Sequence, residues 1–325
     1  MDTATHLVVG IGLAGLAHVD PLVAADQNLA VAVAIGTVAG SQAPDLDTLL
    51  RIRSNALYIR HHRGASHSLP ALFIWTVLVT AGAALVTGTG HIDHLAAWVC
   101  AAVCFHVAQD LFNAYGTQAL RPLSKRWIAW NIIHIFDPII FTSHLIAILL
   151  WLSQAWPPER IFVSLYGLLA AYYLWRTLAH AFLKRKLPRI DPEHQVGDAY
   201  EIFPTYKIGI WNIVKTRADG SYRIGEWSKR RLRWVAHARC DDHPAVEASK
   251  QQADVAALLQ LTRYACATCI EHEWGYEVRW TDMRYRHRKQ YPFVAIVLFD
   301  RKLRPIDSYV GWLSDAKLKK RLRLT

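Results

Sequence analysis

The chain has 325 residues, of which 53% are hydrophobic, and its formal net charge is +11 at pH 7. The charge is not distributed evenly along the chain. Residues 1–183 hold 9 basic and 9 acidic residues, whereas residues 184–325 hold 28 basic and 17 acidic residues, so a chain of uniform composition is excluded. An apolar, neutral part is therefore followed by a basic part with the character of a water-soluble domain, and the length allows these to be two domains.

Six apolar segments follow one another in the first part. They cover residues 5–18, 29–43, 69–88, 94–115, 135–152 and 160–183. The last four are long enough to span a bilayer, which takes roughly 20 helical residues. The first two are short and rich in small residues that let helices pack closely, so they either span with help from neighbours or form a re-entrant pair. No Lys or Arg precedes the first segment, so no secretory signal is expected. The sequence predicts an α-helical polytopic membrane domain over residues 1–185.

The distribution of basic residues predicts the orientation of these segments. The loop 44–68 carries four arginines, the loop 116–134 carries Arg121, Lys125 and Arg126, and the last segment ends in three basic residues at 184–186. The alternate loops carry no Lys or Arg. Because positive charge marks the cytoplasmic side, the second part of the chain is predicted to be cytoplasmic.

Residues 190–325 are predicted to form a small α+β domain. The stretches 200–216 and 221–240 have strand character, with a hairpin turn at Asp219-Gly220. Residues 244–270 are expected to be helical. The stretches 276–288 and 292–312 again have strand character, the second with a hairpin around 300–305.

The excess positive charge of this domain suits anionic lipid headgroups, although a solvated basic face needs no partner. Nucleic acid is not expected, because no nucleic-acid-binding motif accompanies the basic residues. Cys266 and Cys269, with His272 nearby, lack a second pair of zinc ligands and are read as buried thiols on a helix. The segment Lys317–Arg323 either lies on the membrane or is solvated. The sequence does not define an oligomeric state.

Histidine and aspartate residues gather at the cytoplasmic ends of the apolar segments. These residues are His6, Asp45, Asp47, His61, His62, His67, His106, Asp110 and Asp137. Ionisable groups at a membrane are costly and persist where they pair or bind something. His106 and Asp110 lie one helical turn apart on the same face, so both can reach one ion. A mixture of imidazoles and carboxylates suits a divalent transition metal, zinc first, with manganese or iron as alternatives. Single membrane histidines are read instead as hydrogen-bonded core residues, namely His18, His91, His94, His134, His144 and His180.

Several of these residues stand in motifs that resemble a known family. Thr5-His6, Pro44-Asp45-Leu46-Asp47, the stretch from His62 to Ser68 (HRGASHS) and His106-x-x-x-Asp110 are similar to the LexA-regulated, membrane-bound metal-dependent hydrolases, over about residues 1–150. The resemblance implies a bacterial inner-membrane protein with hydrolase activity. A remoter similarity, to zinc-dependent phospholipase C, implies an all-helical site with two or three zinc ions that acts on phosphodiesters.

Carried over residue by residue, the resemblance implies a set of metal ligands. They are His6, Asp47, His62, His67, His106 and Asp110, with Asp45 as a ligand or as a partner of one. His61 lies outside the pattern. The implied number of ions is one to three.

A reaction can be assigned to such a site. Two metal ions would activate a water molecule and neutralise charge on a phosphoryl group, with Asp45 or Asp137 as the base. Arg63 would hold a phosphate oxygen or pair with Asp45. Gly64 would permit the turn between His62 and His67, and Ser68 would cap the next helix.

The leading hypothesis is therefore hydrolysis of a phosphoester in a lipid or lipid-linked substrate at the cytoplasmic membrane face. The alternatives are a transporter of metal ions or small solutes, and a regulatory membrane protein without catalytic activity.

Overall fold

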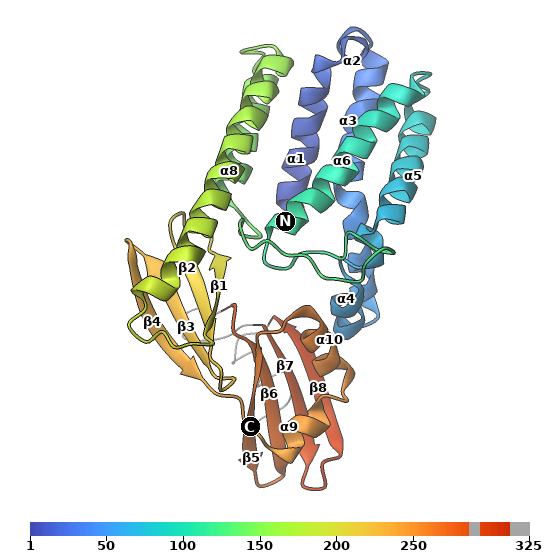
Figure 1. Cartoon of the computed structure of the whole chain (residues 1–325). Coiled ribbons are helices and arrows are strands. Elements are labelled where there is room, and N and C mark those ends of the chain that lie inside the picture. Colours follow the sequence, from blue (N-terminus) through green and yellow to red (C-terminus); the bar gives the residue numbers. More distant parts are fainter. Residues whose placement is uncertain (286–292, 313–325) are drawn as a thin grey trace. The chain divides into compact units, whose positions relative to one another are not determined.

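The computed structural model describes residues 1–285 and 293–312, and the chain begins with a set of apolar helices (Figure 1). The longer ones are α1 (Thr3–Leu16), α3 (Gln27–Gln42), α5 (Leu69–Thr87), α6 (Ile92–Phe112), α7 (Pro138–Leu152) and α8 (Pro158–Ile190). Short helical segments lie between them: η1 (Ala17–Val19), α2 (Pro21–Ala25), η2 (Ala43–Ile52), α4 (Asn55–His61) and η3 (Ala65–His67).

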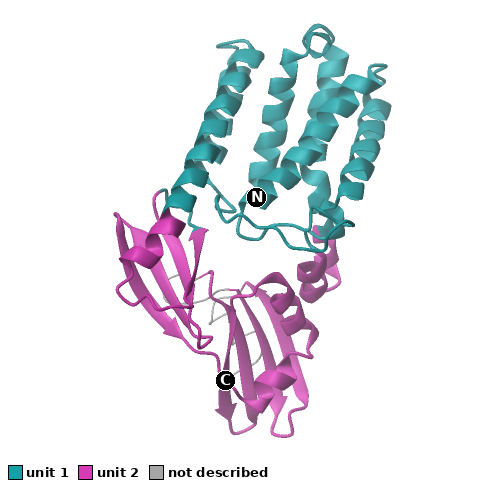
Figure 2. Cartoon of the chain, in the orientation of Figure 1, with its two compact units in different colours: residues 1–47, 62–182, 204–208 teal, residues 48–61, 183–203, 209–325 magenta. Residues whose placement is uncertain are grey.

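The chain divides into two compact units, which Figure 2 colours separately. The first contains residues 1–47, 62–182 and 204–208, and the second contains residues 48–61, 183–203 and 209–325. The division falls inside α8, a few residues before the boundary at 185 that the sequence suggests, and α4 belongs to the second unit.

Helix α3 is central in the first unit because it packs against α1, α5 and α6. Leu29 and Val33 of α3 are fully buried with Leu95 and Val99 of α6. Gly36 allows this close approach, since a Cβ added there would lie 2.6 Å from a methyl group of Val99. Small residues therefore hold α3 against α6.

Among the described residues, four helical stretches are long and apolar enough to cross a membrane. They are Gln27–Ile52, Leu69–Thr87, Ile92–Phe112 and Pro158–Ile190. The fifth apolar segment, expected to span, is the 15-residue helix α7. The second segment was expected to be short, but its helix continues into the 3₁₀ segment η2. The observed helix ends therefore differ from the ends of the apolar segments, because capping residues and irregular turns also determine where a helix ends and hydropathy does not detect them.

The second unit contains two four-stranded sheets together with short helices, which confirms the prediction of an α+β domain. The first has the order β1 (Ala199–Pro204), β2 (Trp211–Thr216), β3 (Tyr222–Ser228), β4 (Arg231–Ala238). The second has the order β5 (Ala265–His272), β6 (Gly275–Asp282), β7 (Phe293–Asp300), β8 (Pro305–Trp312), with α9 (Pro244–Ser249) and α10 (Ala253–Leu261) packed on it.

The predicted hairpin turns are present at Asp219-Gly220 and between Asp300 and Pro305. The stretch 221–240 is a second hairpin rather than one strand, because Lys229 and Arg230 both have positive φ and turn the chain between β3 and β4.

The expectation of a helix over 244–270 is wrong at its end. The chain leaves α10 at Leu261, and residues 265–272 form the edge strand β5, paired with β6. Cys266 and Cys269 therefore lie on a strand, and Cys266 forms a disulfide with Cys240 instead of being a free thiol. Cys269 is free. The segment Lys317–Arg323 lies outside the described residues.

A buried ion pair joins the end of α8 to the first sheet. The Lys215 ammonium group, fully buried on β2, lies 2.7 Å from Asp191 and 3.2 Å from Asp198. Asp191 also accepts hydrogen bonds from the Tyr200 hydroxyl and the Trp234 indole. Burial raises the pKa of Asp191, but the hydrogen bonds that Lys215, Tyr200 and Trp234 donate outweigh it and lower the pKa to about 2.

This depressed pKa predicts an acid-dependent loss of stability in the first sheet. The stabilisation is present above pH 4 and is lost as the pH falls from about 4 to about 2, with roughly 2 kcal/mol at stake. Hydrogen exchange of the full-length chain, corrected for intrinsic rates, should show β2–β4 opening in this range. Asp191→Asn should open β2–β4 already at neutral pH, whereas Asp307→Asn, at an exposed site on β8, should not. Equal protection of β2–β4 in both variants would contradict the prediction.

Candidate metal centre

Segments that are distant in sequence bring histidine and aspartate side chains together within the first unit. His6 lies on the second turn of α1, and η2 supplies Asp45 and Asp47. The turn after α4 supplies His62, and η3 supplies His67. The last two turns of α6 supply His106 and Asp110. Most of the ligand set that the sequence suggests therefore meets at one end of the helices.

Four of these residues form a group that we call the inner cluster: Asp45, His67, His106 and Asp110. One potential ligand atom from each lies within 4.8 Å of all the others. The Nε2 atom of His67 is 3.3 Å from Nε2 of His106, 3.4 Å from Oδ2 of Asp110 and 3.6 Å from Oδ1 of Asp45. The Nε2 atom of His106 is 3.6 Å from Oδ1 of Asp45 and 3.7 Å from Oδ2 of Asp110.

These separations fit four ligands of one metal ion. Tetrahedral ligands bonded to zinc at about 2.0–2.1 Å are roughly 3.3–3.4 Å apart, close to the distances in the inner cluster. Oδ1 of Asp45 and Oδ2 of Asp110 are buried and accept no hydrogen bond within the chain. Buried carboxylate oxygens without a hydrogen bond require a partner from outside the chain, such as an ion. The side chains present therefore fit a divalent metal.

The hydrogen bonds of the two imidazoles direct their lone pairs into the inner cluster. His106 donates its Nδ1–H to the Ser41 carbonyl oxygen at 2.7 Å. The Ser66 hydroxyl donates to Asp47 at 2.5 Å, so it accepts the Nδ1–H of His67 at 2.9 Å. When either ring is neutral, its Nε2 is then the unprotonated nitrogen. Burial lowers the pKa of His67 to about 4, which keeps this ring neutral at pH 7, as metal ligation requires.

A second set of ligands, the outer group, consists of Asp45, Asp47 and His62. Their potential ligand atoms also lie within 4.8 Å of one another. The His62 Nδ1–H donates to Asp47 at 2.7 Å, and the other oxygen of Asp47 accepts the Arg63 backbone N–H at 3.1 Å. The outer group is more accessible than the inner cluster, because all three of its residues are partly exposed. Asp45 belongs to both sets.

His6 lies beside the inner cluster rather than within it. Its ring stacks on His106 with the centroids 3.8 Å apart, and its Nε2 is 3.5 Å from Oδ1 of Asp110, the oxygen turned away from His67. The Met1 amino group contacts both His6 and this same oxygen. His6 therefore orients the cluster residues in this arrangement.

Arg63 contacts two side chains that the sequence analysis did not assign to it. Its guanidinium group is buried and lies 3.1 Å from Asp110 and 3.1 Å from the Asn113 amide oxygen. Arg63 also has the positive φ of the turn, 61°, whereas Gly64 has φ −92°. The turn thus places Arg63 against the inner cluster. Asn113, which also donates to Asp110, was missed because its position after α6 carries no motif.

Asp137 belongs to neither group. It is the N-cap of α7, where one oxygen accepts the N–H groups of Ile139 and Ile140 and the other accepts the Tyr172 hydroxyl. The sequence Asp-Pro is typical of a helix start, and this signal could have identified the cap. The structure therefore gives Asp137 a structural role in place of the expected role as base. Ser68 does occupy the N-cap position of α5, although its hydroxyl bonds to Ala65.

Three of the histidines expected to be structural make such contacts, although His94, like His91, is partly exposed rather than in the core. His18 and His144 each donate Nδ1–H to the backbone carbonyl one turn earlier, and His94 pairs with Asp20 at 2.6 Å. His61 is exposed at the end of α4.

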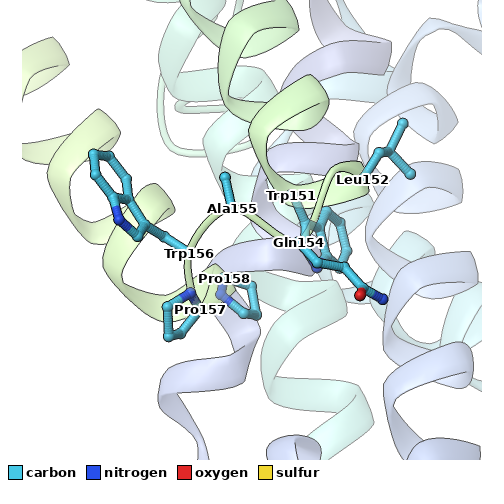
Figure 3. Close-up of a pocket in the computed structure, with 7 residues that line it drawn as sticks. All are labelled: Trp151, Leu152, Gln154, Ala155, Trp156, Pro157 and Pro158. Carbon is cyan, nitrogen blue, oxygen red and sulfur yellow. The ribbon is translucent and has the colours of Figure 1, made fainter.

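A hollow of about 590 Å³ lies elsewhere, at the turn between α7 and α8 (Figure 3). Trp151, Trp156, Pro157 and Pro158 line most of it. It lies past the C-terminal end of α7, about 22 Å along that helix from Asp137. No titratable side chain lines this hollow, so the inner cluster is the better candidate for a reactive site.

Comparisons with known proteins agree with a two-part membrane protein. The family described as YdjM inner membrane protein matches residues 1–183, and the domain described as YfhP C-terminal alpha/beta plait domain matches residues 244–322. The uncharacterized protein YfhP of Bacillus subtilis (strain 168) is 43% identical over 330 residues, covering 100% of this chain and 99% of that protein. No solved structure matches the chain.

The inner cluster predicts how metal content responds to mutation. His106→Ala and Asp110→Ala should each lower the affinity for metal by at least about 10–100-fold. Mutating a residue that only hydrogen-bonds to a metal ligand already has an effect of this size, and these two residues would be ligands themselves. The protein should still accumulate in the membrane, because Leu95, Val99 and Val103 hold α6 in place. His94→Ala, at the other end of the same helix, should leave metal content unchanged.

Elemental analysis and metal titration of the purified variants test this prediction. Full metal content in both cluster variants would place the ions elsewhere. Loss of both proteins from the membrane would show that the pair is needed for folding.

Proposed function

The chain belongs to the YdjM inner membrane protein family, and we propose that it is a membrane-bound, metal-dependent hydrolase. One observation carries the proposal: five of the six separations among the four ligand atoms of the inner cluster are 3.3–3.7 Å, and both Nδ1–H groups are bonded outside the cluster. A hydrogen-bonded structural cluster would place protons between these atoms instead.

The two sets of ligands suit two ions. The inner cluster offers four protein ligands and would enclose an ion completely, as structural zinc sites do. The outer group offers three, so a water molecule or substrate could occupy a fourth position, as in catalytic sites. A divalent ion bound there would act as a Lewis acid and lower the pKa of a coordinated water molecule. Zinc suits both sets, and manganese or iron would suit the carboxylate-rich outer group.

The chain's own residues organise the reaction around these sets. Asp45 belongs to both sets, and an oxygen of Asp45 that holds no ion would orient the water molecule. Ser66 joins the sets, since its hydroxyl bonds to Asp47 in one and His67 in the other. Arg63 is engaged by Asp110 and Asn113, which supports a role in holding the cluster over a role in clamping phosphate.

A phosphoester in a lipid or lipid-linked molecule is the substrate class that we infer. The cluster lies where α1 begins and α6 ends, so it is near one end of membrane-length helices. A headgroup at the membrane surface would reach that level, whereas the acyl chains would remain in the bilayer. Transporters tend to place their sites near the midplane, so this position favours hydrolysis over transport.

We place this end of the helices, and the second unit, on the cytoplasmic side. The loops flanking the cluster carry the basic residues of the first unit, as positive-inside orientation requires. The excess positive charge of the second unit would attract anionic lipid headgroups of the same leaflet.

Adjacent histidines provide a matched test of the hydrolase. Metal-loaded protein in mixed micelles should hydrolyse at least one member of a panel of lipid phosphomonoesters and phosphodiesters, and a chelator should abolish this activity. His62→Ala should lower the activity by about 100-fold or more, because catalytic groups contribute on that scale. His61→Ala, one residue earlier and exposed, should leave it unchanged.

The metal content of the same samples separates the possible failures. The His62→Ala protein should retain the ion of the inner cluster. If the wild-type protein with its full metal content hydrolyses no phosphoester, the proposed activity is ruled out. If the His62→Ala and His61→Ala variants are equally active, the outer group does not take part in the reaction.

The orientation can be tested with two reporters fused after Thr325, one active only in the cytoplasm and one active only outside it. We expect activity from the cytoplasmic reporter alone. The opposite result would reverse the topology, and it would suit the Cys240–Cys266 disulfide, since disulfides persist mainly in oxidising compartments.

A further inference from the structure

A closed loop projects from the long connection between α6 and α7, which Figure 1 draws in green at the end of the helices where the N-terminus lies. Thr117 and Ile128 form an antiparallel bridge, with N···O distances of 3.0 and 2.9 Å in the two directions. Inside the bridge, the Gln118 side chain donates to the Lys125 carbonyl oxygen at 2.9 Å. These bonds hold residues 118–127, which we call the bridged loop, in one shape.

The tip of the bridged loop exposes apolar and basic side chains that are close together in the sequence. Leu123 is 82% exposed and Leu120 is 45% exposed, with Pro122 exposed between them. Lys125 and Arg126 follow directly and are also exposed. A single exposed leucine is ordinary, but two leucines beside two cations have the composition of segments that lie at a membrane surface.

The bridged loop is joined to a helix that faces lipid. The Leu69 N–H, at the first residue of α5, donates to the Arg121 carbonyl oxygen at 3.1 Å. Only a small part of α5 is buried, and Phe73, one turn further along, is 71% exposed. The tip of the bridged loop is therefore bonded to the first residue of a helix whose apolar side chains are largely exposed.

We propose that the bridged loop lies in the headgroup region of an anionic lipid leaflet. Leu120 and Leu123 would enter the apolar boundary, while Lys125 and Arg126 would contact lipid phosphates. Continuity with α5 and the sign of the charge both favour this occupant over a protein partner. The proposal does not depend on the chemistry at the inner cluster.

The contact would also set the level of the candidate metal centre relative to the bilayer. The Gln118 N–H, at the base of the loop, donates to the Arg63 carbonyl oxygen at 3.0 Å. Arg63 in turn contacts Asp110 of the inner cluster. A loop held at the headgroups thus holds the cluster within reach of a headgroup.

A fluorescent probe at the tip tests this directly. The full-length chain, with Cys100, Cys104 and Cys269 replaced by alanine, would carry Leu123→Cys labelled with an environment-sensitive nitrobenzoxadiazole group. In nanodiscs of phosphatidylcholine and phosphatidylglycerol, its emission should shift to shorter wavelength. Nitroxide-labelled lipid should quench it. The matched control is Val196→Cys, at a residue 99% exposed in the second unit, which should show neither effect.

Two further comparisons test whether the two cations contribute to lipid binding and whether lipid, protein or water contacts the tip of the loop. Lys125→Gln with Arg126→Gln should reduce the quenching by at least about two-fold, because each cation strengthens binding to an anionic surface. Equal quenching with and without these cations would overturn the assignment to anionic lipid. A shifted emission without quenching would show that protein covers the tip, and an emission like that of the control would show that water does. Either result overturns the proposal.

Discussion

The candidate metal centre of the first unit depends on two imidazole nitrogens that face each other across the inner cluster. Nε2 of His67 and Nε2 of His106 are 3.3 Å apart, and both Nδ1–H groups are bonded elsewhere. In neutral imidazoles these nitrogens carry lone pairs, which repel at this distance, and Oδ1 of Asp45 and Oδ2 of Asp110 lie beside them without a hydrogen bond. Such a contact is costly in a low-dielectric interior unless a cation occupies the space between the four groups.

Much of the surrounding structure serves to hold these groups close. Gly36 and Gly40 let α3 approach α6, and the carbonyl of Ser41, just beyond Gly40, then reaches His106. The irregular segments η2 and η3 follow and supply Asp45, Asp47 and His67, while the turn between α4 and η3 supplies His62. Close helix packing and irregular connections therefore act together, since neither alone would bring the aspartates of η2 to the histidine of α6.

Sequence reasoning identified the members of the cluster better than their roles. Asp45, His67, His106 and Asp110 could be placed at one membrane level because apolar segments set the ends of helices. Which residues are ligands depends on angles and hydrogen bonds, so His6 was grouped with the ligands although it stacks on one of them.

The second unit shows a similar limit. Its hairpins were predictable because turn residues act locally, whereas β5 was taken for helix because its character comes from pairing with β6, which is not encoded in its own residues. The bridged loop carries no periodic pattern at all, and only the bond between Thr117 and Ile128 reveals its shape.

The membership of Asp45 in both the inner cluster and the outer group has a thermodynamic consequence. Two ions that share a carboxylate do not bind independently: the first neutralises charge that would attract the second, but it also orders the ligand that the second needs. Whichever effect is larger, linkage requires it to be reciprocal, so the ions must alter each other's affinity by the same factor. The chain would then respond to metal availability in a graded or a switch-like way, according to the sign of that one coupling.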